Sequence, residues 1–248
     1  MLALKNAAAD GYTLGVGTTG TMATNTYLLE NAPYDPLKDF RLVAPFFTAP
    51  LVIIVNQAAP FQTLPELLAS ARKEPGSVTW GIPGAGSAQH VAGELLFERA
   101  GVTMQRVPYR GSGAAIQDLI GGRIMLMTDS LSATLPLIES GKVKALAVTT
   151  ARRVLQLPNV PTVAETGFPG YSAYGWGGIL APADTPDAVV EKVADTIRTV
   201  MNRNTFQTRL ESRALIADLR SAEEWKDFVQ SQISQIAGLL AKAGVPRQ

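Results

Sequence analysis

The chain has 248 residues, of which 46% are hydrophobic and 17% charged, so it can form a large core and is not expected to be disordered. Its 22 Lys and Arg residues nearly balance 21 Asp and Glu residues, and the net charge of +1, without runs of like charge, argues against a nucleic-acid partner. The absence of cysteine and the single histidine exclude disulfides, thiolate catalysis and His-rich zinc sites, and no metal or cofactor is predicted.

No apolar run approaches the roughly 20 residues needed to span a bilayer, and the first residues lack the hydrophobic core of a signal peptide. Residues 2–9 are predicted to be the end of a helix, and residues 12–17 a buried strand. This strand leads into a polar loop that begins with Thr18 and Thr19, two candidate ligand contacts. A helix is predicted over residues 22–29.

The next apolar segments indicate a strand and a capped helix. Residues 50–56, PLVIIVN, are almost uniformly apolar and β-branched, which is typical of a strand buried on both faces. Thr63 then stands at the N-cap of a helix that ends before Gly76.

The stretch 78–97, VTWGIPGAGSAQHVAGELLF, combines a short strand, a glycine-rich turn and a helix. Ser87 occupies the N-cap position, so the free amides of the helix start should point at the turn. Small residues at Gly84, Ala85 and Gly86 let a ligand approach the backbone, and the helix start suits a carboxylate or phosphate. An ordinary βα turn is an equally good interpretation, because the motif lacks the lysine of a P-loop.

His90 lies one turn into the same helix, three residues after Ser87. A serine nucleophile with a histidine base would suit an esterase, but no third partner is evident and the G-x-S-x-G pattern is not met. We therefore expect His90 to line the cleft or to bond a neighbouring loop, and a Ser-dependent esterase is the less favoured function.

A second glycine-rich loop, residues 108–113, follows a predicted strand at 103–107 and opens a helix that extends to Ile120. The Tyr109 hydroxyl could bond a ligand there, and the Arg110 guanidinium could neutralise a carboxylate. A solvated charge at the rim is an equally good interpretation of Arg110.

Residues 124–128 are predicted to be a strand that delivers Asp129 and Ser130 at its carboxyl end, before a helix over 132–140 and a strand over 143–149. Asp129 could act as a general base, anchor a loop or hold an amino or hydroxyl group of a ligand. No second carboxylate lies at a recognisable spacing, so acid–base catalysis is not supported. Ser130 is a weaker candidate of the same kind.

This alternation of strands and helices indicates βαβ units and a mostly parallel sheet. Ligands of such sheets bind beyond the carboxyl ends of the strands. The loops that follow Gly17, Gly81, Val107 and Met127 are therefore predicted to face one cleft.

The alternation stops in the last third of the chain. Residues 152–173 contain three prolines and are predicted to be an extended segment ahead of a strand at 174–180. Tyr174 and Trp176 in that strand could form an aromatic wall for a ligand or pack in the core. Three helices are then predicted, from Pro186 to about Met201, over 205–211, and over 225–243 behind a capping box of Ser221 and Glu224. The composition is consistent with two lobes, formed by residues 1–56 with 166–248 and by residues 57–165.

Three stretches resemble the tripartite tricarboxylate transporter receptors, the solute-binding proteins of the Bug/TctC type: GIPGAGSAQHVAGELL, VPYRGSGAAIQDLIGGRIMLMTDSLSATLPLIESGKVKALAVTTARR and LPNVPTVAETGFPGY. The similarity extends from DGYTL at residues 10–14 to the last helix. The resemblance implies a type II-like periplasmic-binding-protein fold, α/β, in which two lobes with mixed, mostly parallel sheets close about a hinge on a small carboxylate. It also implies a periplasmic location, no enzymatic activity and docking on membrane transporter subunits of the tripartite type.

The sequence departs from this family at its start. Members usually carry a signal peptide, a first strand, a glycine-rich PFxxGGxxD-like loop, a helix and a second strand before DGYTL, and these are missing here. We therefore expect an incomplete first lobe with an exposed apolar edge, which a homodimer could cover. A truncated remnant that no longer serves transport, or an oligomeric binding module, is the alternative function.

The candidate ligand contacts are, in chain order, Thr18, Thr19, Gly84, Ala85, Gly86, Ser87, His90, Tyr109, Arg110, Asp129, Ser130, Tyr174 and Trp176.

Overall fold

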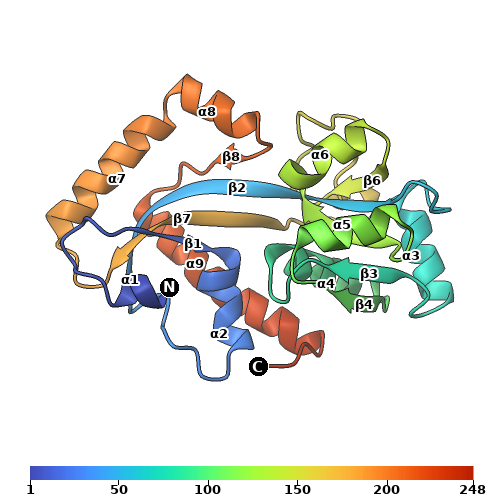
Figure 1. Cartoon of the computed structure of the whole chain (residues 1–248), viewed down its shortest axis with the longest axis horizontal. Coiled ribbons are helices and arrows are strands. Elements are labelled where there is room, and N and C mark those ends of the chain that lie inside the picture. The colour runs from blue at the N-terminus through green and yellow to red at the C-terminus, as the bar shows by residue number, and fades with distance from the viewer. Residues whose placement is uncertain (248) are drawn as a thin grey trace. The chain divides into compact units, whose positions relative to one another are not determined.

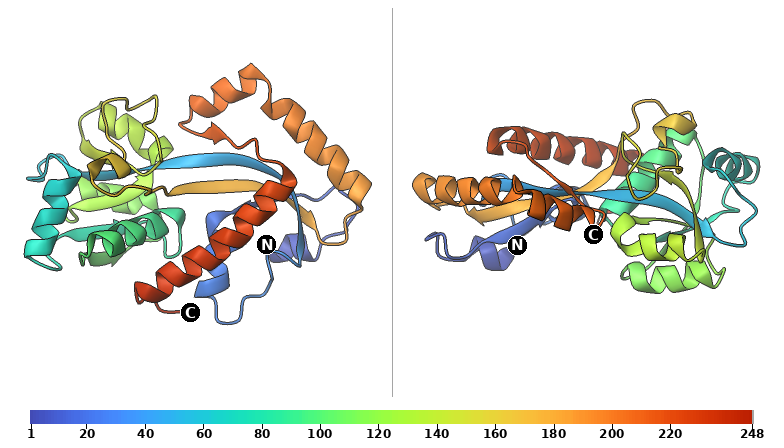
Figure 2. Two further views of the ribbon diagram at one scale, coloured as in Figure 1. Left: turned by 180° about the vertical axis from the view of Figure 1, so that it is seen from behind. Right: turned by 90° about the horizontal axis from the view of Figure 1, so that it is seen from above.

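The structure is a computed structural model that describes residues 1–247, and the chain forms two compact units. Unit 1 combines Met1–Thr48 with the residues from Trp176 onward, and unit 2 is the continuous segment Ala49–Gly175. The chain passes between the units inside β2 (Phe40–Asn56) and inside β7 (Tyr174–Pro182), two strands that can be followed in Figures 1 and 2. The sequence analysis places the boundaries at 56/57 and 165/166, whereas the structure has them at 48/49 and 175/176, within unbroken strands.

Unit 1 is built on a sheet in the order β1-β7-β2, with β8 also paired to β2. The strands β1 (Gly15–Thr18) and β8 (Ile216–Ala217) both run antiparallel to their partners. The helical segments of this unit are α1 (Leu2–Lys5), the π-helix η1 (Thr19–Thr24), α2 (Asn25–Leu28), α7 (Asp187–Met201), α8 (Asn204–Glu211) and α9 (Ala222–Lys242).

The strand at the start of unit 1 differs from its prediction. The strand is shorter than residues 12–17, and Tyr12 and Val16 are 95% and 53% exposed. In the described part of the chain β1 pairs with β7 alone, so its other edge has no neighbouring strand to cover it. The side chains of Leu14 and Val16 line an open groove of about 440 Å³, together with Phe46, Ile179 and Ile197. Among the described residues, β1 thus has an unpaired edge, as expected, but it is only four residues long, and Val16 is its one large apolar side chain.

Unit 2 contains a mixed sheet in which β2 lies between β6 and the run β5-β3-β4. The strands β3 (Thr79–Ile82), β4 (Gln105–Pro108) and β5 (Leu126–Ser130) are parallel, whereas β2 pairs antiparallel with β5 and with β6 (Val143–Val148). The helices are α3 (Leu64–Lys73), α4 (Ala88–Ala100), α5 (Ser112–Ile120) and α6 (Leu131–Glu139). The predicted α/β class with mixed sheets is confirmed.

The core of unit 2 is centred on Trp80, which is fully buried on β3. Its ring meets the Phe97 ring of α4 edge to face, with ring centroids 4.9 Å apart. Gly93 brings the backbone of α4 against the same indole, because a Cβ built there would overlap the ring. This close approach fixes the position of α4 on the sheet.

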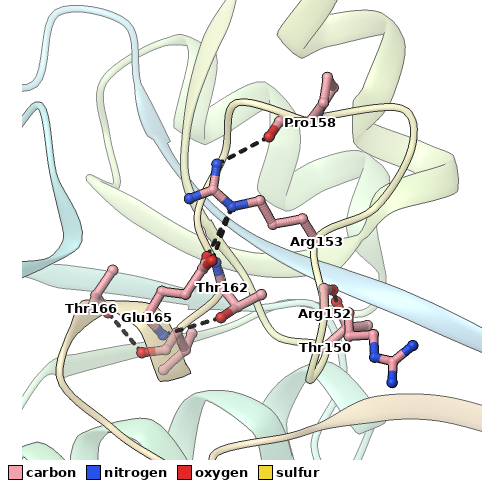
Figure 3. A network of polar contacts seen from close by, with 8 residues as sticks. Thr150, Arg152, Arg153, Pro158, Thr162, Glu165 and Thr166 are labelled. Carbon is pink, nitrogen blue, oxygen red and sulfur yellow. Dashed lines mark hydrogen bonds and ion pairs between the residues drawn. The ribbon is translucent and has the colours of Figure 1, made fainter.

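The segment between β6 and β7 is ordered by polar contacts, as Figure 3 shows. The Arg153 guanidinium donates to both carboxylate oxygens of Glu165, at 3.0 and 3.2 Å, and to the Pro158 carbonyl at 3.1 Å. Glu165 also accepts from the Thr162 amide at 2.7 Å, beside the short 3₁₀-helix η2 (Ala164–Thr166). The segment thus has a defined path, although it lacks the periodicity of a helix or strand.

Within residues 1–247, no helix combines the length and apolar character required to span a bilayer. The same residues hold no cluster of three or more acidic or histidine side chains suited to a metal ion.

Candidate functional site

Three helices of unit 2 begin at the same edge of its sheet. Because β3, β4 and β5 are parallel neighbours, their carboxyl ends share an edge, and α4, α5 and α6 start from it (Figure 1). Each helix start leaves backbone amides without intrahelical partners and carries a partial positive charge. Three of the four loops predicted to face one cleft, those after Gly81, Val107 and Met127, lie at this edge. The loop after Gly17 belongs to unit 1, and the shared cleft stays a prediction.

The start of α4 has the cap that the sequence predicts. Ser87 Oγ accepts a hydrogen bond from the His90 amide at 3.2 Å, and the Ser87 amide donates to the Gly84 carbonyl at 3.1 Å. Among the described residues, the amides of Ala85, Ala88 and Gln89 make no hydrogen bond within the protein. The Ser87 hydroxyl proton and these amides are therefore donors that an anion could use.

His90 points back into unit 2 and bonds the loop, which is one of its two predicted fates. Its Nδ1 accepts from the Gly86 amide at 3.0 Å, and its Nε2 lies 3.3 Å from Glu94 Oε1. Gly86 is thus not a free donor for a ligand. Neither ring nitrogen bonds the Ser87 hydroxyl in the described part of the chain, so the esterase arrangement is wrong.

Glu94 is a buried carboxylate that the sequence analysis did not select. The Arg106 guanidinium of β4 binds both its oxygens, at 2.6 and 2.8 Å. Burial raises the pKa of Glu94, but hydrogen bonds from His90 and Arg106 outweigh burial and hold the pKa below its ordinary value. Its spacing of four residues from the only histidine is the signal that could have marked it.

Asp129 ends β5 and brings the starts of α4 and α5 together. Its Oδ1 accepts from the Ser112 hydroxyl at 2.9 Å, the Ser130 amide at 2.7 Å and the Gln89 side chain at 3.4 Å. Its Oδ2 is buried and has no partner among the described residues. Burial is the main influence on the pKa of Asp129 and raises it above the ordinary value, and the three hydrogen bonds offset this effect only in part.

Gln89 and Ser112 are contacts that the sequence analysis missed. Both lie in the first turn of a helix that starts at the common sheet edge. Choosing first-turn polar residues at every predicted βα junction would have found them.

For the side chains of the other candidates in unit 2, no hydrogen bond to Asp129 is recorded across the described residues. The Tyr109 hydroxyl donates to Asp118 at 2.8 Å, and burial and this carboxylate raise the pKa of Tyr109. Arg110 is exposed and has no polar partner among residues 1–247, as expected for a rim charge. Ser130 precedes α6 without a side-chain cap, and Tyr174 is half-buried at the start of β7.

The candidates of unit 1 are engaged within that unit. Thr18 and Thr21 form a reciprocal capping box at the start of η1. The buried Thr19 hydroxyl accepts from the Trp176 amide at 3.1 Å, and the Trp176 ring packs edge to face on Phe228. For Trp176, packing in the core is therefore the outcome that the structure supports.

The geometry of the α4 and α5 starts suits a small anion that also carries a hydrogen-bond donor. Free amides and the Ser87 hydroxyl can hold a carboxylate, while Asp129 Oδ2 can accept from a hydroxyl or ammonium group. The histidine nearest to them, His90, bonds the Gly86 amide and Glu94 through its two ring nitrogens.

Comparison with known proteins assigns the chain to a family. Residues 1–245 match the family model described as "Tripartite tricarboxylate transporter family receptor". The UPF0065 protein in the tcbD–tcbE intergenic region of Pseudomonas sp. strain P51 is 38% identical over 188 residues, which is 75% of this chain and 56% of that protein. The chain therefore spans little more than half the length of that relative.

Two solved structures are similar over nearly the whole chain. R. palustris Rpa4515 with adipate has a TM-score of 0.91 and 32% identity, covering 99% of this chain and 82% of that one. MatC from Rhodopseudomonas palustris with bound malate has a TM-score of 0.83 and 29% identity, covering 96% of this chain and 82% of that one.

The family is one of solute-binding receptors and not of enzymes. The match over residues 1–245 identifies this chain as a member of the tripartite tricarboxylate transporter receptor family.

Proposed function

We propose that this protein is a receptor for a small organic carboxylate, which it holds at the start of α4. The observation that carries this proposal is the set of free donors around Ser87, next to the start of α5. Similar receptors have been solved with adipate and with malate, two carboxylates, which supports the same ligand class here.

We further propose that Asp129 favours carboxylates with a hydroxyl or ammonium group. An ionised carboxylate buried with one bare oxygen is costly, and a donor from the ligand would remove that cost. Among the predicted contacts, Ser87, Ala85, Gly84 and Asp129 belong to this site; Arg110 and Ser130 are its proposed outer contacts. Ligand contacts of Thr18, Thr19, Tyr109, Tyr174 and Trp176 are weaker proposals, since most of their polar groups already have partners within the protein.

The partner and location follow from the family. We propose that the loaded receptor acts in the periplasm and delivers its ligand to the membrane subunits of a tripartite transporter. The description of the matching family as transporter receptors supports this assignment.

Calorimetric titration with dicarboxylates, hydroxy acids and amino acids tests the proposal. We expect binding of at least one class, and Ser87→Ala should weaken it by about 1 kcal/mol, or roughly fivefold. Ser221→Ala is the matched control, because Ser221 caps α9 in unit 1 and should affect stability without affecting affinity. A folded protein that binds none of these ligands would refute the proposal and favour a remnant without transport function.

A further inference from the structure

His90 has a geometric role that ligand contact does not explain. It is the third residue of α4, and its backbone amide donates to the Ser87 hydroxyl while its ring accepts from the Gly86 amide. The two hydrogen bonds tie the helix start and the loop to each other, as the two bonds of a capping box do. Here the ring replaces the usual Glu or Gln and reaches one residue further back.

His90 contacts the loop before α4 through the Gly86 amide. Gly86 is buried and adopts a φ of +73°, in the left-handed region, directly before Ser87. The preceding turn closes through the Ser87 amide and the Gly84 carbonyl. The free Ala85 amide lies in this turn, in the peptide directly before the one that His90 holds.

The hydrogen bonds also determine the protonation state of the ring. Because Nδ1 accepts from the Gly86 amide, the single N–H proton of the neutral imidazole must be on Nε2, which faces Glu94 Oε1. Arg106 on β4 holds Glu94 through two bonds, and from β3 the uncharged Trp80 ring packs on the imidazole with centroids 5.7 Å apart. Glu94 and Arg106 are thus the charged groups that face this ring.

We propose that His90 is a positioning residue of the carboxylate site, whose neutral imidazole holds the Gly86 peptide, and with it the α4 loop, in the anion-binding conformation. This inference rests on the proposed carboxylate function. Protonation would place a second N–H on Nδ1, opposite the Gly86 N–H, so two donors would face each other and the hydrogen bond would be lost. Carboxylate affinity should then fall when His90 becomes charged.

Two substitutions distinguish the hydrogen bond made by Nδ1 of His90 from the one made by Nε2. In His90→Asn the amide oxygen can take the place of Nδ1 and accept from Gly86, whereas in His90→Gln the amide nitrogen can take the place of Nε2 and donate to Glu94. We expect the Asn variant to bind malate or succinate within about twofold of the parent, and the Gln variant to bind about fivefold more weakly through loss of one hydrogen bond. Equal affinity of the two variants would overturn the proposal.

The pH profile provides a readout that a merely structural role would not change. Affinity of the parent should decline towards acid pH in step with the titration of the His90 ring followed by NMR, and His90→Asn should lack this component. A decline that is identical in the parent and in His90→Asn would contradict the inference.

A measurement without ligand distinguishes this proposal from the proposed function. The amide proton of Gly86 should shift with the protonation of His90 in the free protein, because its acceptor is lost. Failure of the parent to bind any carboxylate would refute the receptor function. If the parent binds a carboxylate but the chemical shift of the Gly86 amide proton does not change with pH, only the proposed role of His90 is refuted, and the receptor function stands.

Discussion

Asp129 is a buried residue for which we propose a link between stability and ligand choice. It lies at the end of β5 with three hydrogen bonds to Oδ1 and none to Oδ2 among the described residues. Such a carboxylate is destabilised in its ionised form, because burial removes water from it without supplying a full set of partners. A ligand donor at Oδ2 would lower this cost, which is the physical basis for the proposed preference.

Asp129→Asn should therefore stabilise the free protein at neutral pH. The folded-state pKa is raised above the ordinary 3.8, so the carboxyl subtracts stability as the pH rises past 3.8 and through the folded-state value. The neutral amide avoids this loss, and the gain over the parent should disappear below pH 3.8, where Asp129 is protonated in both states.

Urea denaturation of parent and variant across this pH range measures the effect. Asp195→Asn is the control, because Asp195 forms an exposed ion pair with Arg198 and its removal should change stability by no more than about 0.5 kcal/mol. An Asp129→Asn protein that is less stable than the parent at pH 7 would show that the buried charge is well compensated.

The individual site residues differ in how far the sequence could predict them. The cap role of Ser87 follows from its place between a glycine-rich turn and a helical pattern. The direction of the His90 ring does not, because either ring orientation satisfies the same spacing. Gln89 and Ser112 meet at Asp129 only through the parallel register of three strands, which no local pattern contains.

At the scale of elements, the close contact between Gly93 and the Trp80 indole is one of the contacts that hold α4 to the sheet. Gly93→Ala should destabilise the protein by about 1–3 kcal/mol, because the added methyl overlaps the Trp80 ring in a packed core. Gly238→Ala is the matched control: Gly238 lies inside α9 with open space at its Cβ, so alanine should stabilise that helix by up to about 1 kcal/mol. Thermal unfolding of both variants tests this, and equal effects would contradict the account of α4.

Helix starts were predicted more accurately than strands. The caps at Thr63, Ser87 and Ser221 are confirmed, because each depends on a local hydrogen bond between a side chain and an amide three residues later. The sequence analysis predicts a strand only over residues 50–56, whereas β2 is continuous from Phe40, although Pro45 and Pro50 lie within it. Pairing with other strands outweighs these local signals, and no sequence pattern reports such pairing.

At the scale of the molecule, the sequence predicted an α/β protein with two lobes, one of them discontinuous. The structure has a continuous unit 2 with its own core, in which we propose the carboxylate site, and a discontinuous unit 1. The family resemblance is confirmed, whereas ligand identity depends on the detailed positions of donors that a sequence does not contain. We therefore propose that the carboxylate binds at one place in unit 2, the start of α4.

Titration of a small dicarboxylate such as malate into the ¹⁵N-labelled protein, followed by amide NMR, tests that claim most directly. The amides of Ala85, Ala88 and Gln89 should shift together, with one midpoint that matches calorimetry, because the bound carboxylate accepts hydrogen bonds from them. Tight binding that leaves these three amides unchanged would contradict the account.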